Sequence, residues 1–374
     1  MKKDRHKNRN RNRSRNRSQN RNRKKAVTGR HALHTLVVLG LLGTSAYLTV
    51  ELREKQDGTA PPVQPVSGAG TTPGSKPASG ERRFERLAAP ARTVVRAADG
   101  GVLATFTDGA RTAVLTGASR TFTEPKYTDA KVTTDSWVRL LPEAWKEGAE
   151  NAAWFKDWFS TSLGSKDPDI FAFAMEYLEG APQKKDAKGV PYSGDAQFGP
   201  LNPNGSVAGD LRLEQSDFYD YLGIPYRFRD GTVEQPETAR FRAMDCSGFV
   251  RTVFGYRARY PLMAKDIKGD GLPRTANGMA RLSPGVPVLE LTGKRPDATD
   301  RLQPGDLVFF DIDKRTGERL DHVGIYMGLD TDGKPRFISS REEANGPTFG
   351  DKGGTARLDG NGFYAAGLRS AKRL

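Results

Sequence analysis

The sequence contains very little cysteine and histidine, with one cysteine and four histidines in 374 residues. One thiol cannot form an intramolecular disulfide, so an apolar core must hold the fold together. A tetrahedral zinc site needs three or four Cys, His or carboxylate ligands close together, and no such spacing is present. The sequence therefore excludes a disulfide-bonded scaffold, and it predicts neither a metal site nor a cofactor.

Most of the chain also lacks net charge. The whole sequence carries +14, but residues 1–30 hold 14 Lys and Arg against the single acid Asp4, a net of +13, which leaves 14 minus 13, or +1, for the rest. The alternation Arg9-Asn10-Arg11-Asn12-Arg13 offers nothing apolar to bury, so residues 1–31 are predicted to form a basic disordered tail. The charge therefore gives no reason to expect nucleic acid as a partner.

A single apolar segment follows the tail. Residues 32–50 contain no Lys, Arg, Asp or Glu, and this length is close to the roughly 20 residues that cross a bilayer as a helix. Basic residues stay on the cytoplasmic side, so we expect a single-pass cell-membrane anchor with the C-terminal part outside the cell. A cleaved signal peptide followed by secretion is the alternative, although no clear A-x-A motif ends the apolar segment.

Composition divides the remaining chain. Residues 51–83 are rich in Pro, Gly and Ser and are predicted to be a flexible linker. Residues 84–200 form a predicted β and helical region, whose role the sequence does not show. Its first part alternates apolar and polar residues at 102–106 and 112–115, beside the hairpin dipeptides Asp99-Gly100 and Asp108-Gly109.

The same region then changes to a helical pattern. Residues 144–163 carry Trp145, Trp154, Phe155, Trp158 and Phe159, an aromatic set whose spacing is more typical of core packing than of a ligand site. A second helix is expected after Asp167-Pro168, with Asp167 as its N-cap.

Cys246 lies in the segment Asp-Cys-Ser-Gly-Phe-Val at 245–250, which begins a helical pattern. A cysteine in the first turn of a helix faces unpaired N–H groups and the positive end of the dipole, which favour the thiolate. Gly248 would allow another backbone to approach. A buried inert cysteine is the alternative interpretation, but isolation of the only thiol in such a segment indicates a nucleophile.

His322 begins a predicted strand, His322-Val323-Gly324-Ile325-Tyr326-Met327-Gly328. Alternation places Val323, Ile325 and Met327 on one face and the imidazole on the other. We expect the glycines to leave that second face open to the thiol. Cys246 and His322 together predict a cysteine hydrolase, with His322 as the general base.

Three blocks in order, DCSGFV at 245–250, LQPGDLVFF at 302–310 and HVGIYMG at 322–328, closely resemble the NlpC/P60 family of papain-like cell-wall peptidases. YLGIPY at 221–226 and LPRT at 272–275 extend the resemblance. It implies an α+β fold in which the nucleophile helix packs on an antiparallel sheet, here over residues 201–374.

The resemblance also implies roles for individual residues. Cys246 would be the nucleophile and His322 the base, while Tyr226, Asp245 and Ser247 would bind the substrate. Pairing of the histidine strand with residues 336–340 puts Ser339 where the family often has histidine. Ser339 is therefore the predicted third catalytic residue, although a hydroxyl supplies no charge to an imidazolium. Three other residues could orient the imidazole of His322 instead, namely Asn345, Ser340 and Asp321.

By this resemblance the expected partner is peptidoglycan, and the expected reaction is hydrolysis of its stem peptides beside D-glutamate. An amidase that cuts between muramic acid and L-alanine would use the same Cys and His. A catalytically silent wall-binding protein is the third possibility, in which Ser339 reflects relaxed catalytic demand.

Overall fold

The computed structural model describes residues 82–205 and 210–374, which all belong to one compact unit. The predicted tail at 1–31, the apolar segment at 32–50 and nearly all of the predicted linker at 51–83 lie outside these residues. Within the two described ranges, none of the helices has the length and apolar character needed to cross a membrane.

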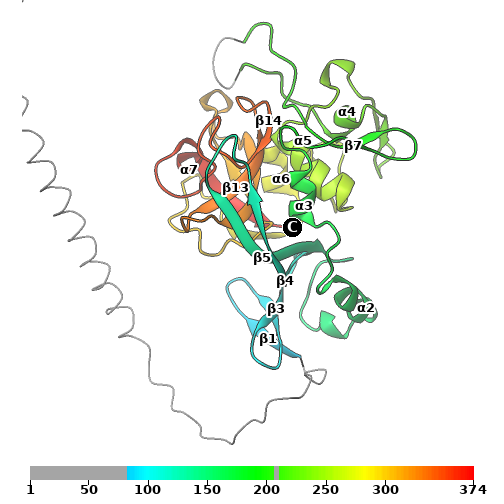
Figure 1. Ribbon diagram of the computed structural model, residues 1–374, viewed down its shortest axis with the longest axis vertical. Coiled ribbons are helices and arrows are strands. Elements are labelled where there is room, and N and C mark those ends of the chain that lie inside the picture. Colours follow the sequence, from blue (N-terminus) through cyan, green and yellow to red (C-terminus); the bar gives the residue numbers. More distant parts are fainter. Residues whose placement is uncertain (1–81, 206–209) are drawn as a thin grey trace, which may run out of the picture. The chain divides into compact units, whose positions relative to one another are not determined.

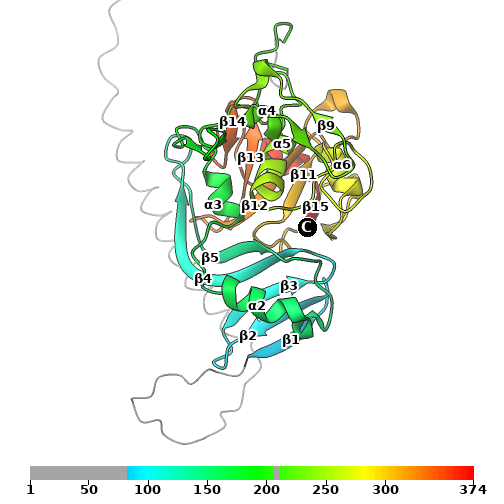
Figure 2. The ribbon, with the colours of Figure 1, turned by 90° about the vertical axis from the view of Figure 1, so that its right-hand side faces the viewer.

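The first sheet is an antiparallel meander of five strands (Figures 1 and 2). In order these are β1 (Arg83–Leu87), β2 (Arg92–Arg96), β3 (Val102–Thr107), β4 (Thr112–Thr123) and β5 (Lys131–Leu140). Gly100 and Gly109 have φ angles of 87° and 83° in the turns on either side of β3, a conformation that glycine adopts without steric cost. The strands predicted at 102–106 and 112–115 are thus confirmed as β3 and the start of β4.

Aromatic side chains form the core beneath this sheet. Helix α2 (Ala153–Ser162), preceded by the 3-10 helix η1 (Ala149–Asn151), lies across the sheet in Figure 2 and contributes the buried Phe155 and Phe159. Trp145 stacks on Phe106 of β3 with the ring centroids 4.4 Å apart. The predicted packing role of the aromatic set is confirmed, although the α-helix begins later than residue 144.

The next helix, α3 (Ile170–Met175), starts two residues after the predicted position. Its N-cap is Asp169 rather than Asp167, because the carboxylate of Asp169 accepts the N–H of Ala172. The same carboxylate also binds Arg120 of β4. This second contact, which is remote in sequence, links α3 to the first sheet.

The second sheet has six strands in the order β10-β15-β11-β12-β13-β14. Their bounds are β10 (Val286–Leu289), β11 (Leu307–Phe310), β12 (His322–Leu329), β13 (Pro335–Arg341), β14 (Gly346–Thr348) and β15 (Leu368–Arg373). All neighbours are antiparallel. Short two-stranded ribbons pair β6 (Lys184–Lys185) with β7 (Pro191–Ser193) and β8 (Tyr226–Arg227) with β9 (Val233–Glu234).

Short helices complete this part of the chain. They are α4 (Phe218–Leu222), the 3-10 helix η2 (Thr238–Arg240), α5 (Cys246–Val250), the π-helix η3 (Arg251–Arg257), α6 (Ala276–Leu282), the 3-10 helix η4 (Lys314–Thr316) and α7 (Phe363–Gly367). The predicted nucleophile helix is therefore α5, which continues directly into η3.

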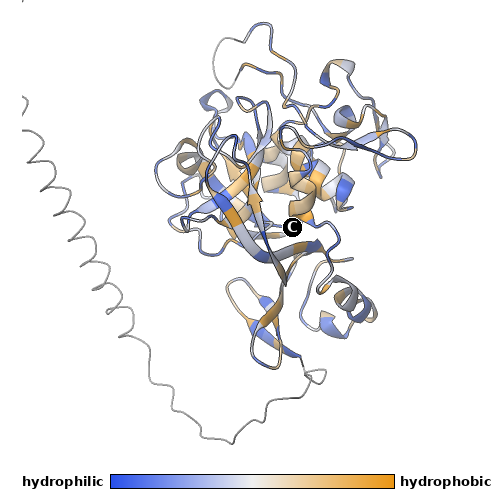
Figure 3. Cartoon of the chain, viewed as in Figure 1, coloured by the Kyte–Doolittle hydropathy of each residue, from blue (hydrophilic) through white to orange (hydrophobic). Residues whose placement is uncertain are grey.

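Apolar side chains cover both faces of the second sheet. Val323 and Ile325 of β12 share one core with α5, and Tyr326 of that strand shares another with Tyr364 of α7. Figure 3 shows the most hydrophobic segments gathered at the centre of this part, around the sheet and the helices beside it. The sequence predicted an open face on the histidine side, and this is wrong, because α7 and its neighbouring loop pack there.

The two sheets are joined by buried polar contacts. The guanidinium of Arg373 in β15 donates to both oxygens of Asp306 and to the hydroxyl of Thr107 in β3. Glu124, between β4 and β5, accepts from Thr348 Oγ1 and from the N–H of Phe349. The first sheet is thus packed onto the part of the chain that carries Cys246 and His322.

Candidate active site

Cys246 is the first residue of α5. Asp245 caps the helix by accepting the N–H of Gly248 at 2.7 Å. A Cβ at position 248 would collide with the backbone oxygen of Ser216, so glycine is needed for this close approach, as the sequence predicted. The start of α5 is therefore held against the segment before α4.

The thiol lies at the beginning of β12. Its Sγ is 3.7 Å from the carbonyl oxygen of Asp321 and accepts a hydrogen bond from the N–H of Val323. These are the two residues on either side of His322. The structure thus brings Cys246 to the strand position that carries His322, from a helix about 75 residues earlier.

The imidazole of His322 is packed between aromatic rings. Its centroid is 5.2 Å from that of Tyr364 and 5.7 Å from that of Phe310, and the residue is only 6% exposed. These ring contacts restrict the orientation of the imidazole.

Burial makes both groups neutral. Desolvation and the nearby Asp245 and Glu214 raise the pKa of Cys246 well above its ordinary value. Desolvation together with Arg341 lowers the pKa of His322 to about 3. The prediction that the helix start favours the thiolate does not hold for this state, because burial and the two nearby carboxylates raise the pKa of the thiol.

Ser339 does not orient His322. Its hydroxyl accepts the Nε–H of Arg341 at 3.1 Å, and His322 Nε2 has no hydrogen-bond partner among the described residues. Ser339 lies one residue beyond Ile338, which pairs with Ile325, so it faces the histidine side of the sheet as predicted. Its position is nevertheless opposite Gly324, and the hydroxyl is taken by Arg341.

The three alternative residues for orienting His322 also form hydrogen bonds with other groups. Ser340 donates to the carbonyl of Met244, and Asn345 Oδ1 accepts the N–H of Phe198. The Asp321 carboxylate accepts from the backbone of residues 312 and 313 and from the Thr316 hydroxyl. Each therefore supports the local backbone, and none fills the position beside Nε2.

Arg341 is the residue that the sequence did not predict. Counting three residues outward from the Ile325–Ile338 pair leads to His322 on β12 and Arg341 on β13. The guanidinium lies 4.5 Å from the centroid of Tyr364, the ring that also contacts His322. The sequence did contain a signal for Arg341. Extending the predicted pairing of the two strands by two residues beyond Ser339 would have placed Arg341 opposite His322.

The three predicted substrate-binding residues do not line the cavity beside His322. Asp245 is bound to Arg274 at 2.9 Å and also accepts the hydroxyl of Ser247, while Arg274 donates to that hydroxyl as well. Tyr226 packs edge-on against Phe218, with centroids 4.6 Å apart. Their substrate-binding role stays a prediction, but the structure uses Asp245 and Ser247 to fasten α5 and does not bring Tyr226 to the cavity beside His322.

A cavity of about 350 Å³ opens beside His322. Its apolar walls include Phe363 and Tyr364, and its charged lining is Arg341 together with five acidic residues, Glu214, Asp313, Asp321, Glu342 and Glu343. This excess of carboxylates disfavours ligands of high negative charge. Within the described ranges no group of His, Cys, Asp and Glu could hold a metal ion.

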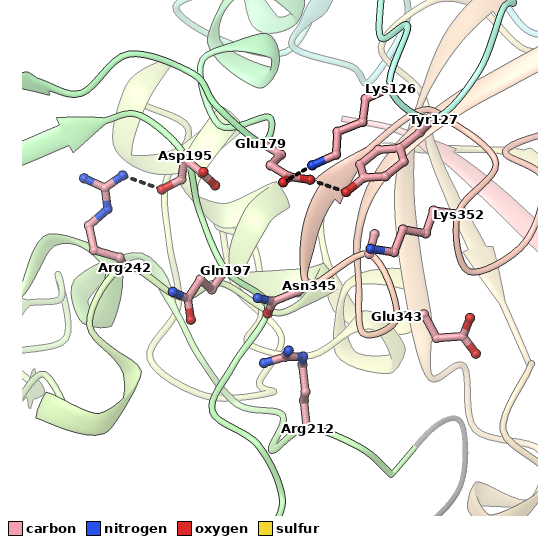
Figure 4. A pocket seen from close by; sticks show the side chains of 11 residues that line it. Lys126, Tyr127, Glu179, Asp195, Gln197, Arg212, Arg242, Glu343, Asn345 and Lys352 are labelled. Atoms are coloured by element: carbon pink, nitrogen blue, oxygen red, sulfur yellow. Dashed lines mark hydrogen bonds and ion pairs between the residues drawn. The ribbon is translucent and has the colours of Figure 1, made fainter.

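A larger pocket of about 700 Å³ adjoins this cavity, because Glu343 lines both. Figure 4 shows its side chains converging from both parts of the fold, with Lys126 and Tyr127 directed toward Glu179. Lys352 faces the Tyr127 ring at 5.1 Å. A polar, mixed-charge pocket with one half-buried ring, that of Tyr127, suits a hydrophilic polymer better than a small apolar ligand.

Comparison with known proteins assigns a family to part of the chain. Residues 223–348 match the NlpC/P60 family, and this segment contains Cys246, His322 and Arg341. No curated protein matches the chain. The chain thus carries an NlpC/P60 family domain, as its sequence motifs indicated, and the domain suggests a cell-wall hydrolase.

Proposed function

We propose that the protein is a cysteine peptidase that hydrolyses peptidoglycan stem peptides, beside D-glutamate. The observation that carries the proposal is the placement of the Cys246 thiol against the backbone on both sides of His322, within a domain of a family whose members generally act on peptidoglycan. The larger pocket beside the cavity supplies room for a polymeric substrate. An anchor at residues 32–50 would place the enzyme outside the cell.

The reaction begins from a neutral pair. The thiol proton passes to His322 as Sγ forms a bond with the scissile carbonyl carbon, and the backbone N–H of Cys246 at the helix start donates to the oxyanion. The C–N bond then breaks and His322 gives its proton to the leaving amine. Water, deprotonated by His322, hydrolyses the thioester and restores the thiol.

Digestion of purified peptidoglycan by the full chain tests this proposal, with the fragments identified by mass spectrometry. We expect new amino termini within the stem peptide for the native protein and none for Cys246→Ala. Ser339→Ala should lower cleavage far less than Cys246→Ala, because its hydroxyl bonds to Arg341 and not to the imidazole. Release of intact stems would instead assign the amidase.

A catalytically silent wall-binding protein is the second candidate, favoured by the raised pKa of Cys246 and the unpartnered Nε2 of His322. Alkylation of Cys246 near pH 7 separates the two. Acceleration of alkylation when stem peptide is added indicates an enzyme whose pair is activated by its substrate. No acceleration and no cleavage would establish the silent protein.

A further inference from the structure

Among the described residues, two buried nitrogen atoms beside the cavity have no hydrogen-bond partner. Over the described residues, His322 Nε2 and Arg341 Nη2 both have no hydrogen-bond partner, although their residues are 6% and 1% exposed. Both residues line the same cavity. An unsatisfied buried polar group costs about 1–3 kcal/mol, so a ligand that bonds to both nitrogens would recover that cost.

Arg341 is held rigidly next to the imidazole. Its Nε donates to Ser339, and its Nη1 donates to the carbonyls of Gly350 and Gly354 at 3.0 and 2.7 Å. Tyr364 contacts both the guanidinium and the imidazole. With the other nitrogens fixed, Nη2 is held in one position beside the cavity that Arg341 lines, and it is a preorganised donor there.

The ligand group must be an acceptor. Arginine only donates, and His322 must carry its proton on Nε2 if Nδ1 is to be free for the proton of Cys246. A carboxylate can accept from both at once, and it supplies the negative charge that Ser339 lacks. The five acidic residues around the cavity repel small free anions, so the carboxylate should belong to a peptide that also carries an amine.

We propose that a carboxylate of the substrate peptide binds between Arg341 Nη2 and His322 Nε2 and serves as the third member of the catalytic group. This inference rests on the proposed function, since it names a required feature of that substrate. The bound carboxylate holds the proton on Nε2, leaves Nδ1 able to accept the thiol proton, and stabilises the imidazolium without becoming protonated itself. Substrate binding thereby converts the neutral pair into a reactive one.

Binding to the full chain carrying Cys246→Ala tests the inference without turnover. A stem tripeptide of L-alanine, γ-linked D-glutamate and a diamino acid is titrated by calorimetry, alongside versions in which each carboxylate in turn is an amide. We expect one amide to bind at least tenfold more weakly. The ratio of the affinities for the carboxylate and amide peptides should fall to near one when Arg341→Met is added. The control is Arg336→Met, which removes a buried arginine of the same strand outside the cavity. It should preserve the ratio.

A second measurement keeps native Arg341, because Arg341→Met also removes the donor to three backbone carbonyls, those of Gly350, Lys352 and Gly354. The ¹⁵N resonances of His322, assigned by their loss in His322→Asn, report the tautomer and pKa of the imidazole in the Cys246→Ala chain. The groups facing it are Arg341, Tyr364, Asp245 and the five cavity acids. Binding of the carboxylate peptide should fix the proton on Nε2 and raise the pKa by at least one unit, and the critical amide should do neither.

The outcomes distinguish this inference from the proposed function. Equal binding of all the amides, with no change at His322, would mean that water satisfies both nitrogens, and it would overturn the inference. Cleavage of every amidated peptide at the native rate would also overturn it while leaving the peptidase intact. Carboxylate-dependent binding without any cleavage would support the carboxylate site and contradict the peptidase.

Discussion

At the scale of single residues, burial away from water determines the ionisation of Cys246 and His322. The same burial raises the pKa of the thiol and lowers the pKa of the imidazole, and Arg341 adds a positive charge beside the ring. Proton transfer from sulfur to nitrogen is thus unfavourable until a negative charge arrives. The residues at this site explain why the motif alone does not guarantee a reactive thiolate.

This burial makes stability depend on pH through His322. The unfolded imidazole takes up a proton near pH 6.5, whereas the folded one does so near pH 3. Between these values the unfolded state holds more protons, so stability falls as the pH drops through this window. From pH 7 to 5 we expect the His322 contribution to the free energy of unfolding to decrease by about 2 kcal/mol.

Urea unfolding at pH 7 and pH 5 measures this effect, with His322→Asn as the comparison. Other groups that titrate here, such as Asp220 with its pKa raised to about 6, are common to both proteins. The native protein should therefore lose more stability than the variant. Equal losses would show that His322 is protonated in the folded protein.

At the scale of elements, α5 is short and depends on its surroundings. Asp245 caps it, and beneath it Arg251 of η3 is fully buried against Asp217 at 2.9 Å. Even together with η3, which continues it, α5 belongs to a helical segment that would be marginal by itself in water. These contacts and the close approach at Gly248 therefore position the thiol. The placement of Cys246 is a product of packing more than of helix propensity.

Gly248→Ala should therefore destabilise the protein and displace Cys246. The added methyl meets the backbone oxygen of Ser216, and overpacking of this kind costs about 1–3 kcal/mol. Gly362→Ala is the matched control, since nothing lies within 4 Å of a Cβ at that position. Thermal unfolding and peptidoglycan cleavage should change in the first variant only, and unchanged cleavage would show that the approach at Gly248 does not position the nucleophile.

At the scale of the whole molecule, the first sheet is part of the same compact unit as the NlpC/P60 family domain. Val138 of β5 belongs to the core that contains Cys246. Lys126 and Tyr127, between β4 and β5, line the pocket next to the cavity. The first sheet thus packs against the core that holds Cys246, and the loop between β4 and β5 forms part of the wall of the larger pocket.

Arg373→Met should weaken both sheets together. It leaves Asp306 buried without its partner, and removing one member of a buried ion pair costs about 3–5 kcal/mol. All four tryptophans lie between residues 137 and 158, so their fluorescence reports the region of the first sheet while far-ultraviolet circular dichroism reports the whole fold. We expect both signals to shift to lower urea by the same amount.

The double variant Arg373→Met with Asp306→Asn is the control, and it should recover part of the loss because no unpaired charge remains. A tryptophan transition that stays at its native position while the dichroism shifts would contradict a single cooperative unit.

Local patterns were sufficient for several features of this protein. Alternation and Asp-Gly dipeptides located β3 and β4, and the helical pattern that begins at 245–250 located the start of α5, because turns and periodicity depend on near neighbours. The segments around Cys246 and His322 likewise indicated the family, which the match at residues 223–348 supports. The predicted start of the first helix and the predicted cap of α3 both differ from the structure. For α3 the reason is that Asp169, the observed cap, is also bound by Arg120 from a distant strand.

Contacts between distant segments decided the rest. The partner of His322 depends on the register between β12 and β13, and the ionisation of the pair depends on how deeply the rings of Phe310 and Tyr364 bury it. Neither quantity is a property of neighbours along the chain. The sequence therefore predicted Cys246 and His322 as the reactive pair from their local segments. Three-dimensional packing set the charge of both groups and gave Arg341, rather than Ser339, the position beside the imidazole.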